Sequence, residues 1–557
     1  MFTMDSLVFL AIAVAILFAA VQRGGDGART MSEKTHRAIC GAAIAAGVLV
    51  RLARLTSLPA GISAEEALVG VQAKALWQTG GFLFGQGLTT QLSQWAGETT
   101  GPLLAVLTAP FVGLFGMSKL TVRLPLALLS CAAMPAAYGL GEALSGRRAA
   151  RWMLLIAALC PIFVLEARMT CGSCAALYLL PIALCLIARG VTKPAALYPG
   201  MIVLALTAYA QDMYFFIAPA AILACAIIAL IFGRRKRHAV ISGTIGLLLC
   251  VPAMLTAFVN LTGAEGMTLL GLIRIPRLVG FEKAFMAENW SVGDKLWAVL
   301  IGGVFQVLRH ENIHQAMYTP DGMLALFMFS LPLMVLGALA LFARWTDGRR
   351  AAREKAAARA MVAATCAVTL AALVMFGSVG TLNTNGTTGL FDHSALILFD
   401  AVLMTAGLCT IERKNLRCAA AMGALMAVNF AWLAVQLFGG SYQANANVYF
   451  PGFEQMAARA AEIQAETGEK INVTGNVYPH IQPSDGAEMM FLYATDADMR
   501  TAEAERGTRY ETIYVSDDMQ PEADQIYLAR TDEISNWDLE GFDYEESEGY
   551  ALIYPAR

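Results

Sequence analysis

The chain has 557 residues, of which 57% are hydrophobic and only 15% charged, and its formal net charge is −3. A mean hydropathy of +0.56 over this length excludes an ordinary soluble protein, because soluble domains are about half apolar and about a quarter charged. The composition therefore predicts a polytopic α-helical membrane protein, and no nucleic-acid partner is expected.

Apolar runs long enough to cross about 30 Å of hydrocarbon recur from the first residues to about residue 438. We expect about 12 transmembrane helices, near 5–22, 38–55, 122–142, 151–167, 173–189, 196–211, 214–232, 238–258, 322–343, 360–376, 393–410 and 418–438. Residues 1–438 are thus predicted to form one transmembrane module.

The basic residues between these runs predict the orientation. If twelve spans are counted, the basic loops at 23–37, 147–151, 189–193, 234–237, 344–359 and 413–417 all fall on one side. Basic loops face the cytoplasm, so both termini are expected outside. This predicts a multi-pass protein of the plasma membrane with an extracytoplasmic C-terminal region.

Three stretches on the outer side are large, at 57–121, 259–321 and 439–557, while the other outer loops are short. In the first, Gly101–Phe115 is apolar but interrupted by Gly and Pro, which is typical of a helix lying along the membrane surface. Lys295–Leu308 in the second stretch has the same character. We therefore expect the functional site on this side of the membrane.

The last stretch, 439–557, differs in composition from the rest. From Gly440 onward it has 23 acidic and 7 basic residues, as expected of a solvated domain. Its patterns predict a small soluble α/β domain with a helix over Gly452–Thr467 and strands over Lys470–Tyr478, Met489–Ala494, Tyr510–Ser516, Gln525–Ala529 and Tyr550–Tyr554.

An acidic pair opens the first outer stretch. Ser63 followed three residues later by Glu66 has the spacing of a capping box, which predicts a helix over Glu65–Trp77 with Glu66 bound to its own helix start. Glu65 is then not required for capping and can act as a catalytic or binding group. A carboxylate in the first turn of a helix is held ionised by the helix dipole, as a general base requires.

The residues around this pair carry a resemblance to a known family. The segments that carry it are Leu58-Pro59-Ala60-Gly61, Glu65-Glu66-Ala67, Gly101-Pro102-Leu103, Pro110-Phe111 and Val122-Arg123-Leu124-Pro125, continued by Pro161, Arg168 and the Tyr209–Pro219 stretch. In this order they resemble the bacterial members of glycosyltransferase family 39, the protein mannosyltransferase and lipid A aminoarabinose transferase relatives.

The resemblance implies a GT-C type fold and an inverting glycosyltransferase. Such an enzyme takes a sugar from a polyprenyl-phosphate donor in the membrane and gives it to an outer acceptor, which is a protein, a lipid or a cell-wall polymer. The family carries an Asp-Glu pair in its first outer loop, with the Asp as base. Glu65 stands at the Asp position in this chain, so the resemblance gives Glu65 and Glu66 as the catalytic pair.

A lipid-phosphate donor is already activated, so the chemistry requires a base for the acceptor and cations for the departing phosphate. No nucleotide-binding fold is required, the sequence identifies no definite cofactor beside the lipid-linked donor, and a divalent cation is compatible with the reaction. Five outward-facing cations are candidates for binding the donor phosphate. They are Arg168, which matches the family pattern, and Arg123, Arg274, Arg277 and Lys283.

Two other functions remain open from the sequence. His310-Glu311-Asn312-Ile313-His314 matches H-E-x-x-H, which on a helix would place His310 and His314 on one face as ligands of a metal. That reading gives a membrane metalloprotease, although no third ligand is evident. The other alternative is a transporter or lipid-carrier flippase, which internal repeats and charges at mid-membrane depth would favour.

Overall fold

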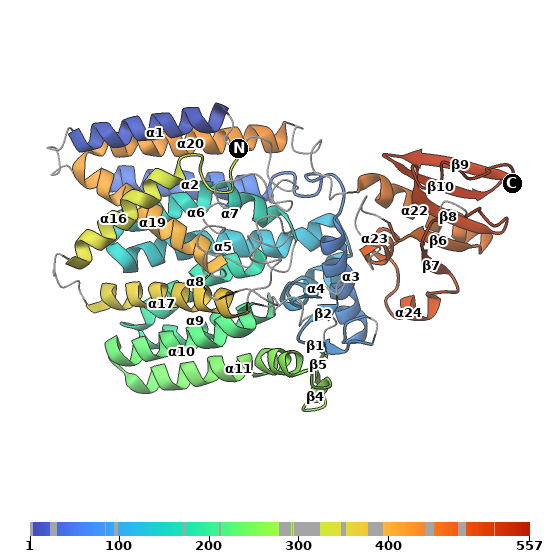
Figure 1. Ribbon diagram of the computed structural model, residues 1–557, viewed down its shortest axis with the longest axis horizontal. Helices are drawn as coiled ribbons and strands as arrows, with labels where there is room; N and C mark the ends of the chain where they lie inside the picture. The colour runs from blue at the N-terminus through green and yellow to red at the C-terminus, as the bar shows by residue number, and fades with distance from the viewer. Residues whose placement is uncertain are drawn as a thin grey trace.

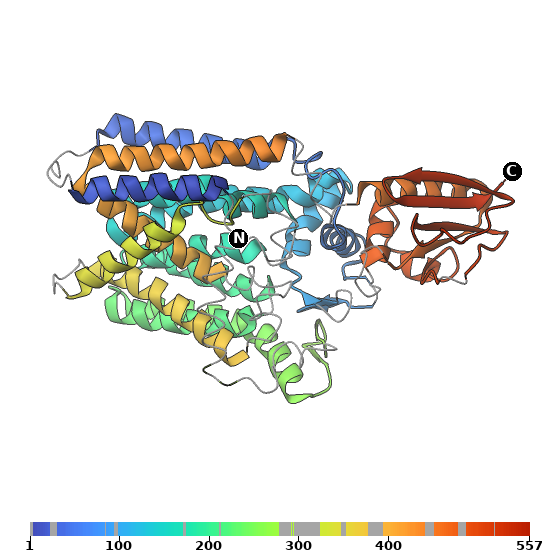
Figure 2. The same ribbon diagram turned by 45° about the horizontal axis from the view of Figure 1, so that its top comes forward.

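The computed structural model describes residues 4–22, 31–83, 85–93, 99–170, 174–210, 213–277, 291, 293, 323–346, 353–376, 394–439, 450–476, 486–516 and 519–556. In these residues the chain forms three parts, which follow one another along the long axis of the molecule (Figure 1). A bundle of long helices lies at one end and a β-sheet unit at the other. Between them is a smaller part built from the stretches around α3 (Ala64–Thr79) and α4 (Leu103–Phe115) and after α11 (Lys236–Thr262), which we call the outer layer because the sequence predicts these stretches to lie outside the membrane. The N-terminus of the first helix points toward the outer layer (Figures 1 and 2).

Each of the predicted spans coincides with a helix or a broken helix. They are α1 (Met4–Gln22), α2 (Glu33–Leu52), α5 (Lys119–Ser145), α6 (Arg147–Leu159) with α7 (Pro161–Leu165) and the 3-10 turn η2 (Glu166–Arg168), α8 (Cys174–Gly190), η3 (Pro194–Ala196) with α9 (Leu197–Leu206) and η4 (Thr207–Tyr209), α10 (Tyr214–Phe232), α11 (Lys236–Thr262), α16 (Ser330–Thr346), α17 (Arg353–Phe376), α19 (Ser394–Lys414) and α20 (Leu416–Phe438).

Among the described residues, 7 of these helices are long and apolar enough to cross a membrane, and the bent pair Arg147–Leu159 and Pro161–Arg168 makes 8. The other four predicted positions carry shorter apolar helices. The polytopic helical class is therefore confirmed. The number of crossings stays a prediction.

The bent pair changes direction by 60° at Cys160. Pro161 has no N–H group and forces the preceding residue into an extended conformation, so the helix cannot continue through it. The N–H group of Ile162 instead donates to the carbonyl of Ala325 at 2.8 Å. Residues 323–329, which contain that carbonyl, are non-helical but entirely buried, so their backbone is shielded by protein.

The outer layer contains α3 (Ala64–Thr79), α4 (Leu103–Phe115) and two small sheets. One sheet pairs β2 (Leu92–Ser93) with β3 (Thr99–Thr100). The other has the order β1 (Leu88–Thr89), β5 (Ile273–Ile275) and β4 (Met267–Leu269), and so joins the first outer stretch to the segment that follows α11. Helix α4 confirms a helix at Gly101–Phe115, and its position along the membrane surface stays a prediction. Lys295–Leu308 lies outside the described residues.

The C-terminal unit contains α22 (Pro451–Thr467), α23 (Gly486–Ala494), α24 (Ala502–Glu505) and a mixed sheet of order β7-β6-β8-β10-β9. Its strands are β6 (Lys470–Thr474), β7 (Tyr510–Ile513), β8 (Gln525–Arg530), β9 (Phe542–Ser547) and β10 (Tyr550–Pro555). Strand β6 runs parallel to β7 and β8, and β10 runs antiparallel to β8 and β9. The α/β character predicted from the sequence is confirmed.

Two details of the predicted tail are wrong. Residues 489–494 were expected as a strand but belong to helix α23, and strand β9 was not predicted. Helix α23 is buried over 486–493, so its sequence has no polar face to reveal the helical period. Strand β9 is a largely exposed edge strand of acidic residues, which lacks the alternation of a half-buried strand.

The C-terminal unit shares a hydrophobic core with the outer layer. Ile62, Leu68 and Val71 from around α3 pack in one cluster with Phe453 and Tyr493 from the C-terminal unit. Figure 1 shows α23 next to α3 at this junction. The sheet unit is therefore held against the outer layer by apolar packing along α3, the helix that opens with the acidic pair.

Candidate active site

Helix α3 begins with the expected capping box. The side chain of Ser63 accepts a hydrogen bond from the Glu66 backbone at 3.2 Å, and the Ser63 backbone donates to Glu66 Oε2 at 3.5 Å. This reciprocal arrangement satisfies two of the backbone donors that a helix start leaves open. The helix therefore starts at Ala64 for a local reason, and Glu65 and Glu66 both lie in its first turn.

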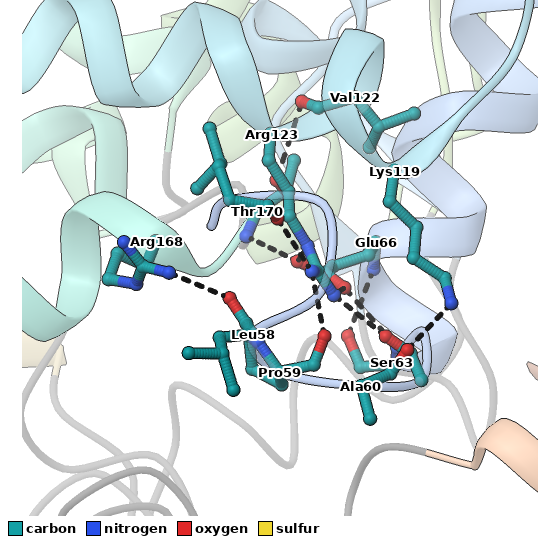
Figure 3. Close-up of polar contacts among 12 residues, drawn as sticks. Leu58, Pro59, Ala60, Ser63, Glu66, Lys119, Val122, Arg123, Arg168 and Thr170 are labelled. Atoms are coloured by element: carbon teal, nitrogen blue, oxygen red, sulfur yellow. Dashed lines mark hydrogen bonds and ion pairs between the residues drawn. The ribbon is translucent and has the colours of Figure 1, made fainter. Parts of the chain in front are cut away.

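Glu66 is fully enclosed and forms a bidentate ion pair with Arg123 of α5 (Figure 3). Arg123 Nε donates to Oε1 at 2.9 Å and Nη2 donates to Oε2 at 2.8 Å. The backbone N–H group of Thr170 donates to the same carboxylate at 3.2 Å. The carboxylate thus joins the start of α3 to α5 and to the end of the bent helix pair.

Arg123 also holds the backbone that leads into α3. Its Nη1 donates to the carbonyls of Leu55 and Pro59 at 3.0 and 2.9 Å, and Nη2 donates to Gly61 at 2.7 Å. A guanidinium has five N–H donors, and together with the two bonds to Glu66 all five are used. In this arrangement Arg123 has no N–H group left for a phosphate, and its geometry is that of a positioning residue.

Arg168, the favoured phosphate ligand from the sequence, is also buried among backbone carbonyls. Its Nη1 donates to Val50 and Ala53 at 2.6 and 2.9 Å, at the end of α2, and Nη2 donates to Leu58 at 3.0 Å. The Leu58 contact is drawn in Figure 3. A cation at a helix C-terminus satisfies open carbonyls and the helix dipole. Arg168 therefore fixes the path of residues 53–58.

Arg51 completes this framework and was not predicted. It is fully buried at the end of α2, and its guanidinium donates to the carbonyls of Ala157, Ala158 and Phe163 around the break between α6 and α7. Hydropathy places Arg51 at the edge of a span, but these three partners are more than a hundred residues away, in addition to the carbonyl of Gly47 one turn before it. No local signal in the sequence could identify them.

Glu65 differs from its neighbour because its side chain is half-buried rather than enclosed. It lies within electrostatic range of the Glu166 carboxyl group of η2. Glu166 is 8% exposed and accepts a hydrogen bond from Cys174 Sγ at 2.8 Å. Sequence reasoning missed Glu166, although an acid at the end of an apolar run, two residues before Arg168, was an available signal.

The remaining candidate cations lie elsewhere. Arg274, on β5, and Arg277 are exposed, and Arg274 Nη1 donates to the carbonyl of Gly85 at 3.0 Å. Arg274 belongs to the small sheet of the outer layer and Arg277 follows it by two residues, and neither belongs to the Glu66–Arg123 cluster. Lys283, His310 and His314 lie outside the described residues. Within the described ranges, no group of three or more His, Cys, Asp or Glu side chains could hold a metal ion.

Polar contacts tie the C-terminal unit to α3. Lys74 forms an ion pair with Asp496 at 2.6 Å, and Gln78 accepts a hydrogen bond from the backbone of Met499 at 2.9 Å. At the other end, Lys119 at the start of α5 pairs with Glu454 of α22 at 2.7 Å. The fold and the site thus define a polytopic helical membrane protein whose C-terminal α/β unit is fixed over an acidic helix start.

Comparisons with known proteins find similarity at the level of structure. No family model matches the chain. No curated protein matches it either. Among solved structures, the chain is similar to the oligosaccharyltransferase AglB from Archaeoglobus fulgidus in complex with an inhibitory peptide and a dolichol-phosphate, with a TM-score of 0.47 and 11% identity over 83% of this chain. This chain covers 64% of that protein, less than two thirds of its length.

The chain is also similar to ArnT from Cupriavidus metallidurans. The structure of ArnT bound to Undecaprenyl phosphate gives a TM-score of 0.46 and 11% identity over 92% of this chain and 97% of ArnT. The apo structure gives 0.46 and 13% over 94% and 98%. AglB and ArnT are both glycosyltransferases with the GT-C fold, the fold type that the sequence resemblance indicates. With TM-scores below 0.5, these likenesses carry no argument about function, which we infer from the chain's own residues.

Proposed function

We propose that this protein is a glycosyltransferase that moves a sugar from a polyprenyl-phosphate donor to an acceptor hydroxyl or amine on the extracytoplasmic face, with inversion at the sugar carbon. The observation that carries the proposal is the different placement of two adjacent acids. The Glu66 carboxylate is enclosed and accepts hydrogen bonds from Arg123, Thr170 and its own helix start. The side chain of Glu65, in the same helical turn, is half-buried. Such an arrangement fixes one carboxylate in order to position the other.

Glu65 is the proposed general base. It takes the proton from the acceptor as the acceptor attacks the sugar carbon, while the lipid phosphate departs with the bonding electrons. Its place in the first turn of α3 favours the ionised form, because the backbone N–H groups and dipole of the helix stabilise negative charge there. A positioned base of this kind accelerates a reaction by roughly 10²–10⁴-fold.

The framework around Glu65 explains how the turn is held. Arg123 and Arg168 bind the backbone of 50–61 from two sides, and we assign both a positioning role. The cations proposed for the departing phosphate are then Arg274, Arg277 and Lys283. The extracytoplasmic placement is supported by the basic loops on one side of the bundle and by the N-terminus, which points toward the outer layer (Figure 1).

The C-terminal unit is proposed to orient the acceptor, because its core continues into α3. The acceptor class is a hydroxyl- or amine-bearing protein, lipid or cell-wall polymer. Membrane lipid surrounds the donor, so the donor reaches Glu65 from the bilayer and the acceptor reaches it from the outer side.

The test is transfer of radiolabelled sugar from polyprenyl-phosphate donors in membranes containing wild-type protein, Glu65→Gln or Glu65→Asp. We expect loss of transfer in Glu65→Gln at unchanged protein level, and retained transfer in Glu65→Asp, which keeps the charge. Full activity of Glu65→Gln would refute the base. Absence of transfer by wild type from every donor, with acceptor extracts supplied, would refute the transferase and favour a flippase.

A further inference from the structure

The small outer sheet of β1, β4 and β5 is amphipathic. Side chains paired across neighbouring strands point to the same face of a sheet, and successive residues point to opposite faces. One face therefore carries the apolar residues Leu88, Met267, Leu269, Ile273 and Ile275, and the other carries Thr89, Thr268 and Arg274. A sheet of this size has no core of its own, so its apolar face needs a covering layer.

Part of this apolar surface is left exposed. Met267 and Leu88 on the apolar face are 43% and 40% exposed, although Ile275 beside them is fully buried. At the tip of the hairpin, Leu270 is 86% and Leu272 is 68% exposed. Large aliphatic side chains held out at the end of a hairpin are unfavourable in water and favourable in a lipid environment.

The residues of the hairpin turn also indicate a contact at its tip. Leu270 and Gly271 have φ of 53° and 69°, and the N–H group of Leu272 donates to the carbonyl of Leu269 at 3.0 Å. Two consecutive positive φ angles are ordinarily served by Asn-Gly or Asp-Gly, because a leucine is strained there. The leucine at the first position is therefore not explained by the turn itself and requires a contact at the tip.

The hairpin follows a helix whose surface is lipid-facing. Along α11, Leu248 and Phe258 are 64% and 58% exposed, as expected for side chains against lipid. Only 263–266 separate the end of α11 from β4, a connection that spans at most roughly 18 Å. Figures 1 and 2 place the hairpin beside the outer end of α11, at the edge of the outer layer.

We propose that the tip and apolar face of this hairpin insert into the headgroup region of the adjacent lipid leaflet. The occupant of the exposed apolar surface is the bilayer itself, continuous with the lipid along α11. Exposed Arg277, two residues after β5, favours anionic lipid phosphates at the depth of the headgroups. The anchoring depends on the apolar tip and face of the hairpin, which have no part in the proposed transfer reaction, and it holds the edge of the outer layer at a fixed depth.

Two adjacent positions give a matched test. The test compares Met267→Cys with Thr268→Cys, each labelled with an environment-sensitive fluorophore. Both are placed in nanodiscs that contain about 30% phosphatidylglycerol, which supplies anionic headgroups. Wild type labelled in parallel gives the background from native cysteines. We expect nitroxide-bearing lipids to quench the label at 267 and an aqueous quencher to quench the label at 268.

Equal quenching of both labels by the aqueous agent would overturn the proposal. Protection of position 267 from both quenchers would also overturn it, because the face would then be covered by protein from this chain or a second copy. Leu270→Asn keeps the turn, since Asn tolerates positive φ, but removes the apolar tip. In that background we expect lipid quenching at 267 to fall and aqueous quenching to rise.

Discussion

The ion pair between Glu66 and Arg123 gives the sharpest prediction about the site. The carboxylate accepts four hydrogen bonds, two from Arg123 and one each from the backbones of Thr170 and Ser63. In Glu66→Gln only one of the two terminal atoms is an acceptor, and the new amide group faces donors on its own side. The substitution keeps the shape but removes the charge and leaves donors unpaired.

The expected loss is large because both partners are enclosed, with side chains 0% and 1% exposed. Breaking a buried ion pair by removing one partner typically costs about 3–5 kcal/mol, since the remaining charge is left uncompensated. The three backbone carbonyls that bind Arg123 carry only partial charge and do not neutralise it. We expect Glu66→Gln to lower the unfolding midpoint strongly, and the half-buried Glu65→Gln to lower it far less.

The assay is heat-induced unfolding in nanodiscs at a fixed heating rate, followed by size-exclusion chromatography of the material that remains monodisperse. A midpoint matters here rather than a free energy, because membrane proteins of this size unfold irreversibly. Arg123→Met is measured alone and combined with Glu66→Gln, and we expect the double variant to lose less than the sum of the singles. An unchanged midpoint in Glu66→Gln would refute the structural role of the pair.

Two glycines test close packing. A Cβ on Gly70 of α3 would lie 2.9 Å from Val122 Cγ2 of α5 and 3.2 Å from the ring of Tyr493, so Gly70→Leu should displace α3 from both α5 and α23 and speed hydrogen exchange in α23, at a cost of about 1–3 kcal/mol. A Cβ on Gly337 of α16 would lie 1.9 Å from the carbonyl of Leu403 in α19, so Gly337→Leu should separate these helices and lower the unfolding midpoint. Gly41→Leu, at a position with nothing within 4 Å, is the control for both, and equal effects in all three variants would contradict the packing.

Sequence patterns predicted the features that depend on local chemistry. Apolar runs gave the positions of the helices, because the energetic requirement to satisfy the backbone in lipid acts within each segment. The capping box at Ser63 and Glu66 was predicted because its partners are three residues apart. The α/β character of the tail followed from short alternating patterns.

Contacts between distant residues were not predictable in this way. Arg123 and Arg168 were expected to face a phosphate, because cations at the outer ends of spans are common lipid-phosphate contacts. Their partners are backbone carbonyls up to 118 residues away in the sequence, and nothing in a side chain identifies a carbonyl as its partner. Glu166 had a local signal, as an acid at the end of an apolar run, but its proximity to Glu65, a residue of another segment, was not predictable.

The arginine framework has a consequence for the proposed chemistry. Arg51, Arg123 and Arg168 bind mainly main-chain carbonyls, at the ends of helices and along 53–61. Carbonyl contacts fix the path of the backbone whatever side chains that segment carries, so the orientation of α3 depends on three guanidinium groups. Lysine cannot reproduce several divergent donors on one planar group. Each Arg→Lys variant should therefore displace Glu65 and reduce transfer, even though it keeps the positive charge.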